Sequence, residues 1–239
     1  MKLLITGADQ PLGQLAADYF QTNHDLRLTG QTPANGVTQS GQDYWPGQTY
    51  WPADLRIPEA VAPLIEGVEA ILHLAVFDPP PLSGPQAEQE RLDLAARGSY
   101  VLLSQARQAG VERLILVSSL AMFAPYPDDY VLDESWQPQP EAQADALAPY
   151  LSEFVCREFA REGGIRTIGL RFGRLGQAGG TPLALAQQAL ASALAAPFSQ
   201  TGYRWQLFHI TDNDRFSTQA AQNGLGLTTG LGLTTKGEA

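Results

Sequence analysis

The fold is decided near the N-terminus by the stretch Leu3-Leu4-Ile5-Thr6-Gly7-Ala8-Asp9-Gln10-Pro11-Leu12-Gly13. Its first four residues form an apolar run that ends at Gly7, a pattern typical of a strand buried on both faces of a parallel sheet. Pro11 suits the first turn of a helix, and apolar residues recur at helical spacing as far as Phe20. A second apolar run follows at residues 26–29 and closes at Gly30. The sequence therefore predicts a β-α-β unit.

Strands and helices continue to alternate along the rest of the chain. Further strands are predicted at residues 70–76, 113–118, 167–172 and 205–210, and helices at 57–65, 86–109, 146–161 and 183–196. The polar, turn-rich residues 31–48 indicate a surface loop or hairpin. Such alternation implies parallel pairing with right-handed crossovers. We therefore expect an α/β fold, a Rossmann-like doubly wound parallel sheet with its ligand crevice at the carboxyl ends of the strands.

The chain length of 239 residues fits one domain of ordinary size. Within it we expect a Rossmann-like core of the dinucleotide-binding type at residues 1–176 and a reduced substrate-side segment, a small C-terminal cap, at 177–223. Residues 224–229 recur as 230–235 and are rich in Gly and Thr, so the segment 224–239 is predicted to be a flexible tail.

Composition excludes several functional classes. Fifteen Lys and Arg against 25 Asp and Glu give a net charge of −10, which argues against a nucleic-acid partner. The single cysteine, Cys156, cannot form an internal disulfide, and the three histidines lack metal-ligand spacing, so no metal site is expected. No apolar run reaches the roughly 18 residues of a membrane span. A cytoplasmic protein without a membrane partner is the expectation.

A series of short motifs then carries a family resemblance. In chain order they are Thr6-Gly7-Ala8, Asp54-Leu55, His73-Leu74-Ala75, Arg97-Gly98-Ser99, Ala109-Gly110-Val111, Ser118-Ser119, Asp133-Glu134 and Leu170-Arg171-Phe172-Gly173. Together they resemble the extended branch of the short-chain dehydrogenase/reductase superfamily, the NAD-dependent epimerase/dehydratases. The resemblance implies binding of NAD or NADP, a Tyr-x-x-x-Lys pair with a helper Ser or Thr, and a nucleotide-sugar or related carbonyl substrate.

The resemblance also implies a set of cofactor-binding residues: Gly7, Ala8, Gln10, Leu12, Gly13, Asp54, Leu55, Leu74 and Ala75. In the family's Gly-x-x-Gly-x-x-Gly loop the middle glycine allows close approach to the pyrophosphate, and here that position is Gln10. The following residue, Pro11, has no N–H to donate. Thr29-Gly30-Gln31 offers neither the acid that selects NAD nor an arginine for NADP, so the preference stays open and weakened binding is expected.

The catalytic positions depart further from the family pattern. Ser119 falls on the helper hydroxyl and Tyr150 on the general acid, but the lysine position four residues later is Phe154. That lysine would acidify the tyrosine and hold the nicotinamide ribose, which a phenyl ring cannot do. The only lysines of the chain are Lys2 and Lys236. Arg157 lies on the same side of the helix and could lend a charge, although it cannot relay a proton and is more typical of a solvated arginine.

Other chemistry-bearing residues have simpler interpretations. His73 lies within an apolar run and is predicted to be a core histidine with satisfied nitrogens. The carboxylates of Asp133 and Glu134 are expected to be solvated.

Two hypotheses about function follow. The favoured one is an atypical family member that has lost the Tyr/Lys pair and binds a small-molecule or nucleotide-like ligand or a partner. The alternative is an active NAD(P)-dependent oxidoreductase or epimerase acting on a sugar or nucleotide sugar with a rearranged site that uses Ser119 and Tyr150. A homodimer is also predicted, through the helices at residues 86–109 and 146–161, which family members use as an interface.

Overall fold

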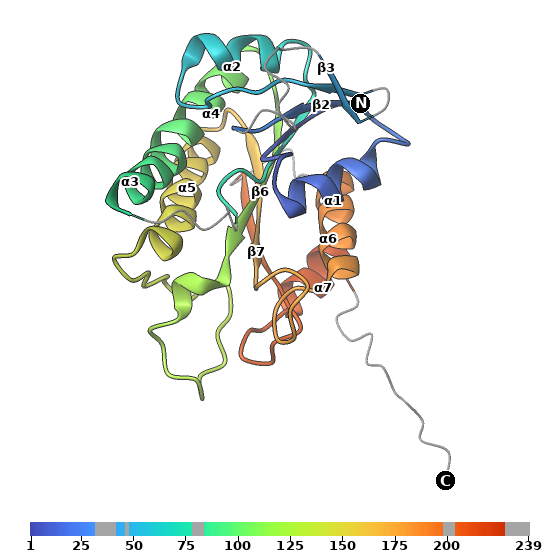
Figure 1. Cartoon of the computed structure of the whole chain (residues 1–239). Helices are drawn as coiled ribbons and strands as arrows, with labels where there is room; N and C mark the ends of the chain where they lie inside the picture. Colours follow the sequence, from blue (N-terminus) through green and yellow to red (C-terminus); the bar gives the residue numbers. More distant parts are fainter. Residues whose placement is uncertain (32–41, 46–47, 78–83, 198–203, 228–239) are drawn as a thin grey trace.

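An eight-stranded sheet forms the centre of the computed structural model, which describes residues 1–31, 42–45, 48–77, 84–197 and 204–227 (Figure 1). The strands are β1 (Lys2–Thr6), β2 (Asp25–Thr29), β3 (Gln42–Trp45), β4 (Gln48–Tyr50), β5 (Ala70–His73), β6 (Arg113–Ser119), β7 (Arg166–Phe172) and β8 (Trp205–Ile210). Their order is β3-β4-β2-β1-β5-β6-β7-β8, and all pairs are parallel except the β3–β4 hairpin. The predicted Rossmann-like doubly wound sheet is confirmed, and its winding reverses between β1 and β5.

Helices cover both faces of this sheet (Figure 1). They are α1 (Pro11–Phe20), α2 (Pro58–Ile65), α3 (Pro85–Asp93), α4 (Ser99–Gln108), α5 (Ala144–Arg161), α6 (Leu183–Ala195) and α7 (Gln219–Leu225). In β1, Leu3 and Ile5 pack into the core with α1 and α6, whereas Leu4 packs into the core with α2 and α4. Because successive side chains of a strand alternate between faces, the unbroken apolar run of β1 buries both.

Two predicted elements differ from the structure in their extent. Strand β5 ends at His73, not at residue 76, because the chain turns there and the Phe77 amide donates to the Leu74 carbonyl at 3.0 Å. The predicted helix 86–109 is divided by a π-helical turn, η2 (Leu94–Gly98), between α3 and α4. A Cβ on Gly98 would lie 3.0 Å from a methyl of Leu94, so this turn brings the backbone unusually close to its neighbours.

The C-terminal part of the chain extends the same sheet. Strand β8 pairs with β7 from Trp205 to Ile210, so no break in the sheet marks the boundary predicted at residue 176. Helix α7 includes residues 224 and 225, and Leu225 and Leu227 are buried in the core with α6. The segment predicted as a flexible tail therefore begins with packed residues, and its remainder, 228–239, lies outside the described residues.

A chain of buried hydroxyl and imidazole groups connects the sheet to the helical layer. His73 Nδ1 lies 2.8 Å from Thr6 Oγ1, and His73 Nε2 lies 3.0 Å from Ser99 Oγ. Ser99 Oγ is in turn 2.8 Å from Ser152 Oγ on α5. A neutral imidazole has one donor and one acceptor nitrogen, which matches its two hydroxyl partners. His73 is thus a satisfied core histidine, and it joins β1, β5, α4 and α5.

This histidine makes stability depend on pH. Complete burial lowers the pKa of His73 from 6.5 to about 4. Between these values the unfolded chain binds a proton that the folded protein does not, so stability falls as pH decreases. We expect His73 alone to lower the free energy of unfolding by about 2 kcal/mol between pH 7 and pH 5.

Urea unfolding at several pH values measures this slope, and His73→Gln should reduce it by the His73 share, leaving the share of His209, whose pKa burial also lowers. The control is His24→Gln, at a partly covered ring between α1 and β2, which should retain most of the slope. Equal slopes for wild type and His73→Gln would contradict the assignment.

Candidate cofactor and substrate site

The loop between β1 and α1 forms a tight backbone cradle at the carboxyl end of β1. Gly7 has φ +72°, and a Cβ placed on it would lie 2.8 Å from Ala75 Cα. A Cβ on Gly13 would lie 2.0 Å from the Gly7 carbonyl oxygen. Neither position can carry a side chain without moving the backbone. The first amides of a helix have no intrahelical acceptor, so the N-terminus of α1 can receive an anion here.

The Gln10 side chain links this loop to the segment that follows β5. Its Nε2 donates to the Ala75 carbonyl at 3.1 Å, and its Oε1 is buried without a hydrogen-bond partner among the described residues. Pro11 occupies the first helical position and contributes no N–H. The predicted cofactor residues Ala8, Leu12 and Leu74 are fully or almost fully buried and pack in the core beneath the loop. The side chain that reaches into the crevice is therefore that of Gln10.

The second predicted cofactor segment, Asp54-Leu55, is engaged within the chain. Arg56 Nε donates to Asp54 Oδ1 at 2.9 Å, and Arg56 Nη2 donates to Oδ2 at 2.7 Å. These hydrogen bonds from Arg56 lower the pKa of the Asp54 carboxyl group. Arg56 also lies 3.5 Å from Asp93, and Leu55 is buried in the core with α2 and α4. Both residues thus fix the segment that follows β4.

A cavity of about 340 Å³ opens beside Ser119, at the carboxyl end of β6. It is also lined by Val76, Phe77, Arg91, Asp145, Pro149 and Arg174. The Ser119 Oγ accepts a hydrogen bond from the Ala121 amide at 3.1 Å. Arg91 pairs with Asp145, whereas the Arg174 side chain is exposed. The cavity therefore combines a hydroxyl group with a positive charge.

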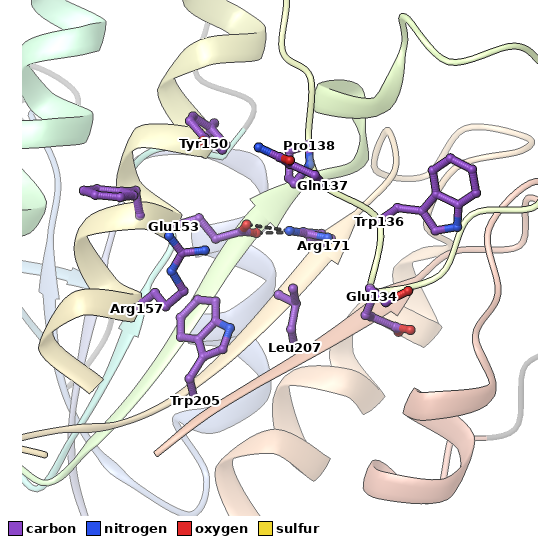
Figure 2. A pocket seen from close by; sticks show the side chains of 12 residues that line it. Glu134, Trp136, Gln137, Pro138, Tyr150, Glu153, Arg157, Arg171, Trp205 and Leu207 are labelled. Carbon is purple, nitrogen blue, oxygen red and sulfur yellow. Dashed lines mark hydrogen bonds and ion pairs between the residues drawn. The ribbon is translucent and has the colours of Figure 1, made fainter. Parts of the chain in front are cut away.

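Tyr150 lies in a different cavity, also of about 340 Å³ (Figure 2). That cavity is lined by Tyr150, Phe154 and Arg157 of α5, by Trp136 and Gln137 of the preceding loop, and by Trp205 and Leu207 of β8. Phe154 is 47% exposed. Successive residues of a helix are rotated by about 100°, so the face of α5 that carries Pro149 toward Ser119 carries Tyr150 away from it. The two predicted catalytic residues do not share a cavity.

Four residues after Pro149 is Glu153, which forms a buried ion pair that sequence reasoning missed. Arg171 Nε donates to Glu153 Oε1 at 2.8 Å and Arg171 Nη2 donates to Oε2 at 2.7 Å (Figure 2). The Arg171 guanidinium also lies 5.0 Å from the centre of the Phe123 ring. The positions of Glu153 and Arg171 in the sequence do not predict the ion pair, because the two side chains meet only when α5 packs across β7.

This ion pair extends into a wider buried polar group. Arg171 Nη1 lies 3.4 Å from His209 Nε2. Burial, aided by the nearby Arg171 charge, lowers the pKa of His209 to about 3. The His209 amide donates to Glu134 Oε1 at 2.8 Å, and burial raises the pKa of Glu134. The expectation that Glu134 is solvated is therefore wrong: it is half-buried and bonded to β8, whereas Asp133 is exposed.

Two further observations concern the described part of the chain. No group of three or more His, Cys, Asp or Glu side chains in it is arranged to hold a metal ion. None of its helices has the length and apolar character needed to cross a membrane.

The model of the NAD dependent epimerase/dehydratase family matches residues 3–222, and the chain belongs to this family. A uronate dehydrogenase of Pseudomonas syringae pv. tomato is 28% identical over 176 residues, covering 72% of this chain. The matched region is 58% of that relative's length.

Solved structures share the fold. A glucuronic acid dehydrogenase from Chromohalobacter salexigens superposes with a TM-score of 0.76 at 18% identity, covering 96% of this chain and 84% of that one. A short-chain dehydrogenase/reductase superfamily protein from Agrobacterium tumefaciens with bound NAD has a TM-score of 0.75 at 16% identity. That match covers 96% of this chain and 93% of the other.

The buried ion pair gives a stability prediction. Replacing Glu153 with Gln leaves Arg171 charged, buried and incompletely paired, and breaking such a pair costs about 3–5 kcal/mol. The double variant Glu153→Leu/Arg171→Met removes both charges and should be more stable than the single variant. Urea unfolding followed by circular dichroism measures the difference.

Glu158→Gln provides the matched control on the same helix, because its ion pair with Arg161 at 2.7 Å is exposed and screened by solvent. The interpretation is contradicted if Glu153→Gln is no more destabilising than this control.

Proposed function

We propose that the protein is an NAD-dependent oxidoreductase or epimerase of this family that acts on a sugar acid or nucleotide sugar. The observation that carries the proposal is the cavity beside Ser119, which adjoins the glycine cradle through the segment from Ala75 to Phe77. Family membership over residues 3–222 and the similarity to uronate dehydrogenases support the same reaction class.

The residues of the crevice fit a dinucleotide. Gly7 and Gly13 allow the tight turn that brings the start of α1 to the carboxyl edge of the sheet, and the amides of Leu12 and Gly13 there can donate to pyrophosphate oxygens. Ala75, in the segment that follows β5, would border the nicotinamide half. When bound, the nicotinamide supplies or accepts a hydride. The protein's own contribution is to hold the two reactants in contact and to exclude water between them.

The cavity chemistry favours an anionic, hydroxyl-rich substrate. Arg174 supplies a guanidinium whose fork matches a carboxylate or a phosphate. Arg91 adds a second positive charge, partly offset by Asp145. Ser119 can exchange a hydrogen bond with a substrate hydroxyl or carbonyl. Sugar acids and nucleotide sugars carry both kinds of group.

A second candidate function is supported by the surroundings of Ser119. Pro149 lies beside Ser119 where an acid/base tyrosine would be useful, and the lysines of the chain are Lys2 and Lys236. This arrangement favours a protein that binds a dinucleotide and an anionic sugar without Tyr/Lys hydride chemistry. Both proposals include a homodimer. The exposed aromatic side chains of Tyr100 on α4 and Phe154 on α5 support it, because a partner subunit could cover them.

Turnover separates the two candidates. Purified protein is mixed with NAD and glucuronate, galacturonate or a UDP-sugar; NADH formation, followed by absorbance, reports oxidation, and chromatography of the sugar reports epimerisation, which forms no net NADH. We expect turnover, with Arg174→Met raising KM at least about tenfold through loss of a charged hydrogen bond. Arg157→Met, which removes an arginine from the Tyr150 cavity, is the control and should leave KM unchanged.

Binding without turnover of any of these sugars would favour the second candidate. A protein that binds neither NAD nor NADP at millimolar concentration would refute both.

Gln10 gives a separate prediction about cofactor affinity. Its side chain crosses the crevice to Ala75, so Gln10→Gly should open the approach to the pyrophosphate and tighten NADH binding by about tenfold. Titration calorimetry measures the dissociation constant. Gln14→Gly, on the exposed side of α1, is the control for the added helix flexibility. Weaker NADH binding by Gln10→Gly would show that the amide holds the cofactor instead of obstructing it.

A further inference from the structure

Gly30, directly after β2, is enclosed by side chains from two other segments. A Cβ built on Gly30 would lie 2.3 Å from Asp9 Oδ1 and 2.6 Å from the hydroxyl oxygen of Tyr50. The Ala8 amide donates to the Thr29 carbonyl at 2.9 Å, which fixes the β1–α1 loop against the end of β2. The space that a side chain at residue 30 would occupy is thus filled by the Asp9 carboxylate.

This position matters for dinucleotide recognition. In Rossmann folds an acid at the end of the second strand accepts a hydrogen bond from the adenosine 2′-hydroxyl, and the same charge repels a 2′-phosphate. Here the strand ends in glycine and carries no acid, but the carboxylate of Asp9 arrives at the same place from the neighbouring loop. A carboxylate is therefore retained at this place, but it is supplied by the β1–α1 loop instead of the end of β2.

The cations that a 2′-phosphate needs are committed elsewhere. Arg27 in β2 donates through Nη1 to the carbonyls of Pro63, Leu64 and Glu66 at 2.7, 2.9 and 3.1 Å, and so caps the end of α2. Arg56 is bound to Asp54 at 2.7 Å. The sequence holds no lysine or arginine between Arg27 and Arg56. Both Arg27 and Arg56 are therefore engaged within the chain on this side of the sheet.

We infer that Asp9 is the specificity-determining residue for the adenosine ribose, and that it selects NAD over NADP. The inference rests on the proposed dinucleotide binding. It adds the preference between NAD and NADP, which the sequence left open. The Asp9 carboxylate accepts hydrogen bonds from the ribose hydroxyls and repels the 2′-phosphate.

Titration calorimetry with NADH and NADPH tests the inference on the unmodified protein. A charged hydrogen bond and the accompanying repulsion predict that NADH binds about 10–100-fold more tightly than NADPH. Equal affinities, or a preference for NADPH, would overturn the assignment to Asp9 while leaving dinucleotide binding intact. Failure to bind either cofactor would overturn the proposed function as well.

Variants then locate the effect. Asp9→Asn should reduce the NADH/NADPH preference to within about threefold, mainly by weakening NADH binding. Asp9→Ser/Gly30→Asp moves the carboxylate to the end of β2 and should restore the preference. Asp18→Asn removes the same charge from the exposed side of α1 and should leave the preference unchanged. A preference that survives in Asp9→Asn would overturn the inference, and thermal unfolding establishes that each variant is folded.

Discussion

The close approach of the β1–α1 loop to the end of β5 is the constraint on which the rest of the structure depends. Residue 7 must be glycine because Ala75 Cα occupies the space that a side chain would fill. Residue 13 must be glycine because the Gly7 carbonyl oxygen occupies the corresponding space there. These contacts place the N-terminus of α1 at the carboxyl edge of the sheet, between the two strands where the winding reverses. At such a switch point the loops on either side diverge and leave a crevice. The close approach of the β1–α1 loop to the segment after β5 therefore explains both the need for glycine at these positions and the location of the candidate ligand site.

The buried chain from Thr6 through His73 and Ser99 to Ser152 extends this constraint to α5. Because Ser152 must face the start of α4 to meet Ser99, the rotation of α5 about its axis is fixed. The adjacent residues Pro149 and Tyr150 then point in different directions: Pro149 faces the cavity beside Ser119, whereas Tyr150 faces the cavity toward β8. The ion pair of Glu153 with Arg171 holds the helix in the same rotation from the other side.

Sequence reasoning located the fold well because the signals it used are local. Apolar runs, the glycine after β1 and helical periodicity are properties of neighbouring residues, and they predicted nearly every strand and helix. The site was harder to predict from the sequence because its geometry depends on helix rotation and on contacts between distant segments. A motif count places Tyr150 opposite Ser119, but a shift of one residue on α5 turns a side chain by about 100°. Likewise, nothing near Gly30 in the sequence indicates that Asp9 fills its empty side-chain space.

The two halves of the candidate site are physically separable. The dinucleotide edge is built by β1, β2, β5 and α1, and its charge comes from Asp9 and the backbone amides. The other edge is built by β6, α5 and β7, and there Glu153 and Arg171 form a buried ion pair whose charges cancel. Arg91 and Arg174 place positive charge in the cavity beside Ser119, between the two halves. Under the proposed function, recognition of cofactor and substrate can be retained while the proton-transfer groups change, because different strands carry the two tasks.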